Sequence, residues 1–452
     1  MTSSSENSKN IQDKSLESDK GDGYQNEYEE LTASDLATFH EREAGRLILD
    51  PLQAKIVFGE AFTSRLKLTV DGSTILWPQP TDDPLDPQNW SSRKKDWHLM
   101  ILVLATIIPN FDSAIGIASV FPLAVQYKTT TEHINDLTSN WSIFLLGPCG
   151  IFATAPQVTG LFVIDDIYPF HLRARKIGIW TTAFIIGPHL SPFVFGFLVA
   201  RANWRWAFGI GCMYGLVVLL LIVFGMEETL YDRRGLRKGL NDRGFRSRLA
   251  TLVGITGWRT ASQGPEWKEL IMQPLRLIWR PHFIGMYLFE AMTFGFPIGV
   301  NITNTIFLQS PPPLGFGLDQ ITVAGIYATP IVAVFIGEVL GRYFNDWVMY
   351  YCVRHNDGIF EAESRLWTCY ISVPLYLIGF LVLGAAFQNH FNIGVVVVGW
   401  AFILISCLMT TTAVSIDDPL PLRNLRIVCG LFILVVPLLQ YKGNVIRRRF
   451  ST

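Results

Sequence analysis

The sequence predicts an all-α polytopic membrane protein in which two helix bundles are joined by a cytoplasmic loop. Half of the 452 residues are hydrophobic and only 17% are charged, against about 25% charged in ordinary soluble domains. Residues 1–96 carry 29 of the 75 Asp, Glu, Lys and Arg residues, and apolar runs recur through the rest. This pattern excludes a single soluble enzyme domain. The net charge of −1 also argues against nucleic-acid binding.

The region 1–96 is predicted to be cytoplasmic and largely disordered. Residues 1–30 are rich in polar side chains and have no apolar period. A short helix is expected within 31–62, interrupted at Pro51. A proline-rich extended segment follows at 77–90, and the charged cluster 93–96 is typical of a cytoplasmic membrane anchor.

A helix needs about 20 mostly apolar residues to cross a membrane. Eight segments meet this requirement: 98–125, 141–164, 177–199, 206–225, 283–308, 322–341, 367–387 and 393–413. They predict a first bundle over 97–226 and a second over 282–414, separated by the loop 227–281. A ninth apolar run, Ile427–Gln440, lies in an atypical C-terminal segment, 415–452. This run is short for a span and is predicted to be interfacial or re-entrant.

Basic residues mark the cytoplasmic side of membrane proteins. The 227–281 loop contains eleven Lys and Arg residues, and the connections 165–176 and 342–366 contain three each. With the N-terminus inside, all of these fall inside. Three links on the opposite side, 126–140, 309–321 and 388–392, hold only Lys128. The topology is therefore self-consistent for eight spans.

Four fragments resemble the major facilitator superfamily, in particular its fungal multidrug:proton antiporter-like branch. They are Asp83-Pro-Leu-Asp-Pro-Gln-Asn-Trp-Ser91 before the first span, Asp166–Arg175, Gly187-Pro-His-Leu-Ser-Pro192 and Phe360–Trp367. Trp204–Phe208 and Glu227–Tyr231 also bracket the expected sixth helix of the family. The order and spacing of these fragments over 83–413 carry the resemblance.

The chain also departs from the family pattern. The family has twelve helices, whereas eight and a fragment are recognised here, and the family's cytoplasmic motif after helix 2 is missing. Residues 155–165 read as the start of helix 2 joined to the end of helix 4, and the pattern stops after Val414. Two interpretations stay open: an incomplete gene model or splice error, and a genuinely shortened protein.

The resemblance implies a secondary active transporter that exports a small organic molecule, a drug or secondary metabolite, in exchange for protons. A proton-coupled importer is one alternative. A truncated non-transporting protein, or a modulatory subunit of a full-length relative, is another. The plasma membrane is the expected location. The expected partners are protons, a small-molecule substrate and lipid, with no nucleic acid, and the oligomeric state stays open. The sequence indicates no cofactor, no metal and no enzymatic motif.

Ionisable and polar groups inside spans are costly and therefore mark candidate functional positions. Asp112 lies midway along the first span, where its carboxylate could bind a proton or a cationic substrate. Glu290, Asn301 and Asn304 follow one another along the 283–308 span and are predicted to form a polar stripe in a central cavity. These four residues are the predicted substrate or proton path.

Gly187, Pro188 and Pro192 form the segment that resembles the antiporter motif of helix 5. Proline removes a backbone donor and bends a helix, and glycine allows close approach of a neighbouring helix. By resemblance, this segment would seal the interface against proton leak, although Ser191 stands where the branch usually has glycine. A single membrane histidine such as His189 is expected to be hydrogen-bonded structure rather than a proton carrier.

A candidate gating motif lies near the end of the 322–341 span. Gly337 and Gly341 are spaced for tight helix contact, and Arg342 and Asp346 are spaced for an i, i+4 ion pair. We expect this pair to form at the cytoplasmic edge and to bias one conformation. Asn140 begins a weak glycosylation sequon on the predicted outside.

Overall fold

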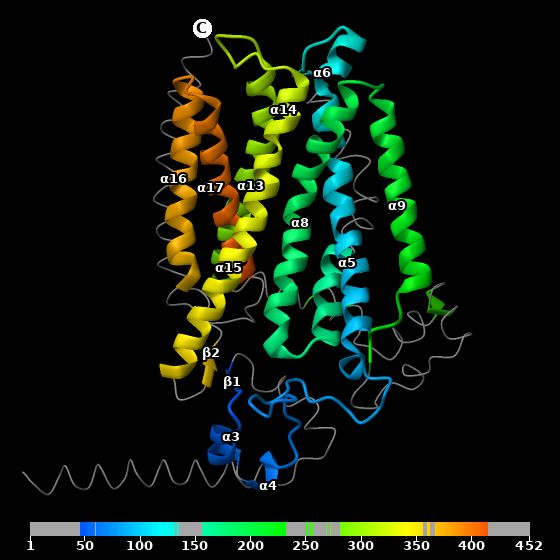
Figure 1. Ribbon diagram of the computed structural model, residues 1–452, viewed down its shortest axis with the longest axis vertical. Helices are drawn as coiled ribbons and strands as arrows, with labels where there is room; N and C mark the ends of the chain where they lie inside the picture. Colours follow the sequence, from blue (N-terminus) through cyan, green and yellow to red (C-terminus); the bar gives the residue numbers. More distant parts are fainter. Residues whose placement is uncertain are drawn as a thin grey trace, which may run out of the picture.

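The computed structural model describes most of the predicted membrane region together with part of the region before it. The described residues are 46–131 apart from Gly59, 133–134, 156–231, 281–355, 359–361, 367–414 and a few isolated positions between 250 and 272. In this part of the chain, seven helical segments are long and apolar enough to cross a membrane. Figure 1 shows them running side by side along one axis. The all-α membrane fold predicted from the sequence is confirmed.

The first group of helices comprises α5 (Ser92–Ser113), α6 (Ile115–Tyr127), α8 (Phe170–Val199) and α9 (Arg205–Gly225). The predicted first span corresponds to α5 and α6 together, which meet at Ala114. Of the predicted span 141–164, residues 141–155 lie outside the described residues, and residues 156–167 are helical. Asn140, Ile427–Gln440 and almost all of the predicted 227–281 loop also lie outside them.

The second group comprises α13 (Pro281–Gln309), α14 (Gln320–Ile326), α15 (Ala328–His355), α16 (Cys369–Gln388) and α17 (Ile393–Val414). One prediction is wrong here, because α15 continues to His355 instead of ending near residue 341. The predicted loop 342–366 is therefore helical in its first part. Aromatic side chains one turn apart, such as Trp347 and Tyr351, stack on this extension with ring centroids 6.1 Å apart. Such interfacial residues allow a helix to continue past the apolar layer.

The largest apolar core lies within the second group and against α8. It is built around fully buried side chains of α15 and α17, with Ile185 and Ile186 of α8 packed against them. The outer face of α9, in contrast, exposes large hydrophobic residues such as Trp206, Met213 and Phe224. An exposed apolar face of this size suits contact with lipid rather than water.

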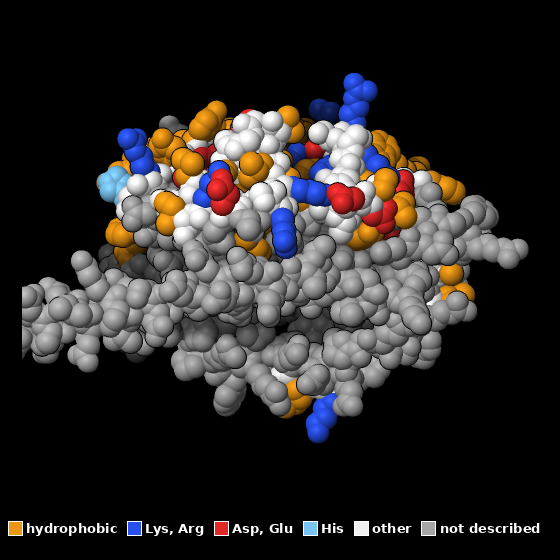
Figure 2. Space-filling model, turned by 90° about the horizontal axis from the view of Figure 1, so that it is seen from below, with side chains coloured by type: hydrophobic (Ala, Val, Ile, Leu, Met, Phe, Trp, Pro, Cys, Tyr) orange, Lys and Arg blue, Asp and Glu red, His pale blue; other side chains and the backbone are white. Residues whose placement is uncertain are grey.

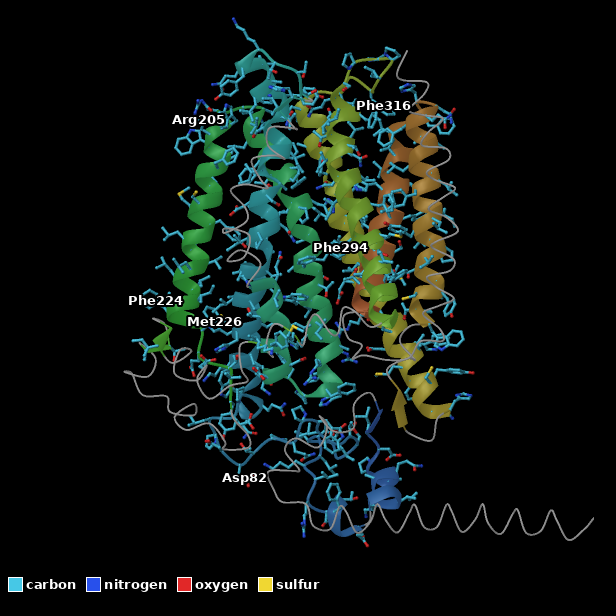
Figure 3. The ribbon with its side chains drawn as sticks, turned by 180° about the vertical axis from the view of Figure 1, so that it is seen from behind. Asp82, Arg205, Phe224, Met226, Phe294 and Phe316 are labelled. Carbon is cyan, nitrogen blue, oxygen red and sulfur yellow. The ribbon has the colours of Figure 1, made fainter. Side chains whose placement is uncertain are left out.

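The segment before α5 and the end of α15 lie at the same end of the helices. Arg205 and Phe224 mark opposite ends of α9, and Asp82 lies at the end where Phe224 is found (Figure 3). Residues 46–91 and the end of α15 gather at that same end, which is the lower one in Figure 1. Seen from below, the described part of this face carries basic and acidic side chains beside hydrophobic ones (Figure 2).

The region before α5 forms a small packed unit at this lower end. Its elements are β1 (Arg46–Ile48), α3 (Pro51–Phe58), α4 (Glu60–Thr63) and the 3-10 turn η1 (Pro87–Asn89). Five buried hydrophobic residues form its core: Ala54, Phe62, Leu66, Ile75 and Trp77. The expectation of a largely disordered 1–96 is therefore wrong for residues 46–96, because enough apolar surface is buried there to hold the chain. Pro51 does not interrupt a helix but begins one, at the first position, where no backbone donor is required.

β1 pairs with a strand that belongs to the second group of helices. Its partner is β2 (Ile359–Glu361), which follows α15, and the two strands are antiparallel with Leu47 opposite Phe360. This pair is the only sheet among the described residues.

Candidate functional site

Helix α8 is the element shared by both groups of helices. It contacts α5, α6 and α9 of the first group and α13, α14, α15 and α17 of the second, and Figure 1 shows it near the middle of the molecule. Close packing at two glycines makes this possible. A Cβ at Gly187 would lie 3.0 Å from Asn110 Cβ of α5, and one at Gly196 would lie 2.6 Å from Ala324 Cβ of α14.

The two prolines of α8 each leave one backbone carbonyl without its helical donor. In an α-helix, residue i donates to the carbonyl of residue i−4, and proline has no N–H to donate. Pro188 therefore frees the carbonyl of Phe184, and Pro192 frees the carbonyl of Pro188. An unsatisfied carbonyl inside a membrane protein is costly, so another donor is required.

Two asparagines supply those donors, one from each group of helices. Asn110 Nδ2 of α5 donates to the Phe184 carbonyl at 2.9 Å. Asn301 Nδ2 of α13 donates to the Pro188 carbonyl at 3.0 Å. The proline pair thus becomes a polar junction that ties α8 to both groups.

His189 fixes the orientation of the Asn301 amide. Its Nδ1 lies 3.0 Å from Asn301 Oδ1. Because the Asn301 nitrogen is used on the Pro188 carbonyl, its oxygen must accept, so the network assigns the proton to Nδ1 of His189. Both side chains are buried. The expectation that His189 is hydrogen-bonded structure agrees with this contact.

The junction continues through Tyr327 and Trp400. Tyr327 OH donates to the Asn301 carbonyl at 2.6 Å and lies 2.5 Å from Thr305 Oγ1. The Trp400 ring of α17 packs edge-on against both His189 and Tyr327, with centroids 6.0 and 5.1 Å apart. Neither of these two ring contacts was predicted, because they join residues more than 70 positions apart in the sequence.

Asn304 lies one turn beyond Asn301 and has a different environment. It is 1% exposed, and neither atom of its amide has a hydrogen-bond partner among the described residues. The same holds for Ser191 Oγ of α8 and Trp400 Nε1 of α17. Buried polar atoms are normally paired, so these three groups, on α13, α8 and α17, are exceptions within the described part of the chain.

Asp112 does not lie at this junction. Its carboxylate faces α9, where a Cβ at Gly211 would come within 2.9 Å of Oδ1. Asp112 Oδ1 is buried without a hydrogen-bond partner in the described part of the chain.

Glu290 lies in the second group and faces α16 and α17. Tyr376 of α16 and Cys407 of α17 approach α13 close to Glu290, because their side chains bond to the backbone carbonyls of Met292 and Thr293. Glu290 Oε2 has no hydrogen-bond partner among the described residues. Asp112 and Glu290 thus occupy different groups of helices, and Glu290 does not share the α8-facing environment of Asn301.

The candidate gating motif is arranged differently from the prediction. Gly337 and Gly341 are the positions at which α15 approaches α17 closely. Asp346, however, pairs with Arg175 of α8 at 3.1 Å. The predicted partner, Arg342, is exposed. The ion pair therefore joins the two groups of helices instead of adjacent turns of one helix.

Glu338 was missed by sequence reasoning. It accepts a hydrogen bond from Thr182 of α8 at 3.2 Å, and a Cβ at Gly178 would lie 2.6 Å from its Oε1. The available signal was an acidic residue inside a span, directly after Gly337. Together with Arg175 and Asp346, it makes the lower half of the α8–α15 contact polar.

Comparison with known proteins gives this fold a family. Residues 90–438 match the Major Facilitator Superfamily profile, so the chain belongs to this superfamily of membrane transporters. It is an integral membrane protein.

Its relatives include named fungal transporters. An uncharacterized MFS-type transporter of Schizosaccharomyces pombe is 22% identical, with the match covering 74% of this chain and 75% of that protein. The MFS transporter fsa7 of a Fusarium species is 23% identical, over 74% of each chain. The efflux pump radE of Floropilus chiversii is 21% identical, over 76% of this chain and 71% of that pump.

Proposed function

We propose that this transporter exports a small organic molecule, a drug or secondary metabolite, in exchange for protons. The observation that carries the proposal is the proline junction of α8, at which Asn110 of one group of helices and Asn301 of the other bind carbonyls only four residues apart. A bent central helix held by both groups is the element about which they can rock in alternating access. The names of related efflux pumps support the direction of transport.

Asp112 and Glu290 are the proposed proton carriers. Each is a carboxylate inside a span with one buried oxygen that lacks a hydrogen-bond partner. A carboxylate in such a position binds a proton readily, because the neutral acid avoids the cost of a buried charge. Because the two carboxylates lie in different groups of helices, the surroundings of each can change separately when the groups rock.

Asn304 is proposed to bind the substrate. Its amide offers two donors and one acceptor with no partner in the described part of the chain. An otherwise apolar surround with a few such polar groups accepts small organic molecules of varied shape.

Gly337, Gly341 and Asp346 are proposed to form the gate at the lower end of the molecule, with Arg175 in the role expected for Arg342. Opening this end separates α8 from α15 and breaks the 3.1 Å ion pair. We place this end, with the N-terminus and the 227–281 loop, in the cytoplasm and the protein in the plasma membrane. The two groups of helices then correspond to bundles 97–226 and 282–414.

Transport assays on sealed vesicles test the proposal. Vesicles with the cytoplasmic face outward are loaded with acid inside and given a panel of fluorescent organic cations and neutral dyes. We expect uptake into the acidic lumen, collapse of this uptake with a protonophore, and its loss in Asp112→Asn and Glu290→Gln. Glu60→Gln is the matched control, because Glu60 is an exposed carboxylate outside the spans.

Three results contradict the proposal. Gradient-driven movement in the opposite direction identifies an importer. Flux that is equal with and without the proton gradient excludes proton coupling. A correctly inserted wild-type protein without any flux across the panel supports the non-transporting alternative.

A further inference from the structure

Residues 46–90, called here the N-terminal strap, cross the lower end of the molecule from one group of helices to the other. Their core is the five-residue cluster around Trp77. Figure 1 shows this unit below the helices, with β1 beside β2 on one side and the segment leading into α5 on the other.

The strap is fixed to the first group of helices at several points. The Phe170 amide at the start of α8 donates to the Trp77 carbonyl at 2.8 Å, and the Phe170 ring packs against the strap core. Tyr231 OH, which follows α9, donates to Asp83 Oδ2 at 2.8 Å. Lys95 Nζ of α5 donates to the Gln88 carbonyl at 2.8 Å.

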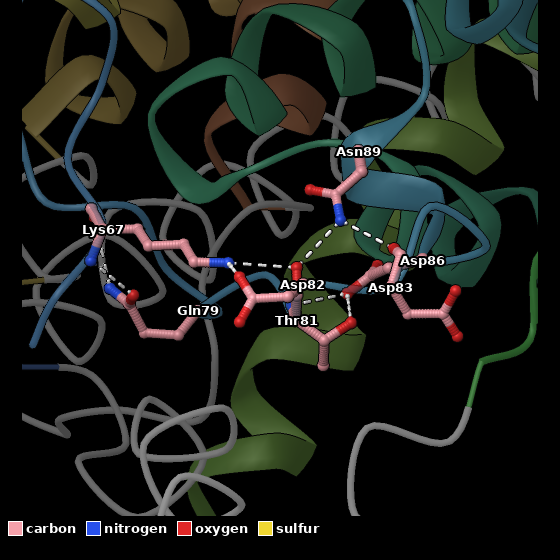
Figure 4. A network of polar contacts seen from close by, with 7 residues as sticks. All are labelled: Lys67, Gln79, Thr81, Asp82, Asp83, Asp86 and Asn89. Atoms are coloured by element: carbon pink, nitrogen blue, oxygen red, sulfur yellow. Dashed lines mark hydrogen bonds and ion pairs between the residues drawn. The ribbon is translucent and has the colours of Figure 1, made fainter.

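Polar contacts make the strap itself rigid. The buried Gln79 accepts from the Lys67 amide at 2.8 Å and donates to the Leu76 carbonyl at 2.6 Å. The fully buried Asp86 accepts from the amides of Thr81 and Gln88, both at 3.0 Å. Figure 4 shows the Lys67–Gln79 and Thr81–Asp86 contacts of this network, in which Asn89 also donates to the Thr81 and Asp83 carbonyls. A segment held by these hydrogen bonds is rigid, so a displacement at one of its ends moves the other end as well.

Among the described residues, the strap is held to the second group by a short strand pair. β1 pairs with β2 through three residue pairs, with Arg46 opposite Glu361, Leu47 opposite Phe360 and Ile48 opposite Ile359. The residue after β1, Leu49, accepts from the Ile75 amide at 3.0 Å and packs on the strap core. β1 therefore cannot move relative to the rest of the strap without breaking these contacts.

We propose that the strap is a built-in latch on the conformational cycle, in which β1–β2 pairing holds the two groups of helices together at the lower end and must open before they separate there. This inference rests on the proposed alternating access between the two groups. The β1–β2 contact is the point of release, because the strap continues covalently into α5 at its other end, whereas backbone pairing holds it to β2. The Arg175–Asp346 ion pair spans the same interface at the same end, so the two contacts open together.

A disulfide across the strand pair tests the latch. Leu47→Cys with Phe360→Cys places the two cysteines opposite each other, at a Cα separation of about 4.5–5.5 Å, which lies within the range that a disulfide accepts. Arg46→Cys with Ile359→Cys is the matched off-register control, because a diagonal pair lies about 7–8 Å apart. Each single variant is oxidised in parallel to account for the native cysteines.

The readout is alkylation of a reporter, Thr182→Cys, measured at that residue by mass spectrometry. Thr182 is buried between α8 and α15, so it reacts only when the groups separate at this end. We expect oxidation of the on-register pair to suppress reporter alkylation and dye efflux together, and a reductant to restore both.

The reverse perturbation releases the latch. Leu47→Pro with Ile48→Pro removes a backbone donor from β1 to β2 in either pairing pattern, because hydrogen-bonded and non-hydrogen-bonded residues alternate along an antiparallel pair, and we expect reporter alkylation to rise about fivefold with the loss of three cross-strand pairs. Val70→Pro is the control, because the Gly72 amide donates to the Thr69 carbonyl and Val70 holds the turn position that favours proline.

Three outcomes overturn the latch: no on-register disulfide forms, a complete disulfide leaves reporter alkylation unchanged, or the double proline variant leaves it unchanged. Alkylation does not depend on transport. If the wild-type protein moves no dye but alkylation still follows the disulfide, the proposed efflux fails and the latch stands.

Discussion

Replacing Asn301 with leucine should destabilise the protein, whereas the same replacement of Asn304 should not. The two residues share helix α13, and both are 1% exposed. Asn301 makes two side-chain hydrogen bonds, to the Pro188 carbonyl and to His189. Asn304 makes none within the described residues.

The expected loss of stability depends on which buried polar groups each substitution leaves without a hydrogen-bond partner. Asn301→Leu leaves the Pro188 carbonyl and the His189 ring nitrogen buried without partners. Such groups cost about 1–3 kcal/mol each in soluble proteins, while side-chain bonds in membrane proteins average about 0.6 kcal/mol. The expected loss is therefore about 1–3 kcal/mol, or about 5- to 150-fold in the unfolding equilibrium. Asn304→Leu removes an unpaired polar group at nearly constant volume, so we expect no loss or a gain.

Unfolding of the purified protein by a denaturing detergent in mixed micelles, followed by tryptophan fluorescence, measures both changes. His189→Leu and the double variant His189→Leu with Asn301→Leu complete a cycle, and their effects should not add, because either single change breaks the same bond. Equal destabilisation by the two asparagine variants, or additive effects in the cycle, would refute the proline junction.

Three further predictions concern single contacts. Gly187→Ala should cost about 1–3 kcal/mol by overpacking, because its Cβ would lie 3.1 Å from the Ile107 carbonyl of α5. Gly215→Ala meets no atom within 4 Å and should be neutral or stabilising in the same detergent unfolding assay, because alanine favours a helix over glycine. Reversing the ion pair with Arg175→Asp and Asp346→Arg together should restore gating that either change alone disturbs. The pair is half-exposed, so its contribution should be below about 1 kcal/mol and weaken in high salt, which reporter alkylation at Thr182→Cys can measure. Finally, burial and then the bond to Asp96 raise the pKa of Tyr168 above its ordinary value. Its contribution to stability is thus complete below the ordinary tyrosine pKa of about 10 and is lost as the pH rises above it. Unfolding between pH 9 and 11 should show this loss in the wild-type protein, with a smaller pH dependence in Tyr168→Phe.

The sequence by itself determined the class of protein and the positions of its helices. Spans are set by local composition, because the membrane requires long apolar runs, so the predicted 206–225 and 393–413 match α9 and α17 within a residue or so. The order and spacing of the fragments over 83–413 indicated the superfamily. Helix ends were harder to predict, because α15 continues beyond the apolar layer, where composition no longer limits it.

Only the tertiary structure decided which partner each polar residue has. Asn301 and Pro188 lie 113 positions apart, and Arg175 and Asp346 lie 171 apart, distances over which no local pattern can select a contact. Packing turned Asp112 toward α9 and Glu290 toward α17, and it took Asp346 away from Arg342. The strap was also hidden in the sequence, because its few apolar residues are scattered among polar ones and form a core only after the chain folds against the start of α8.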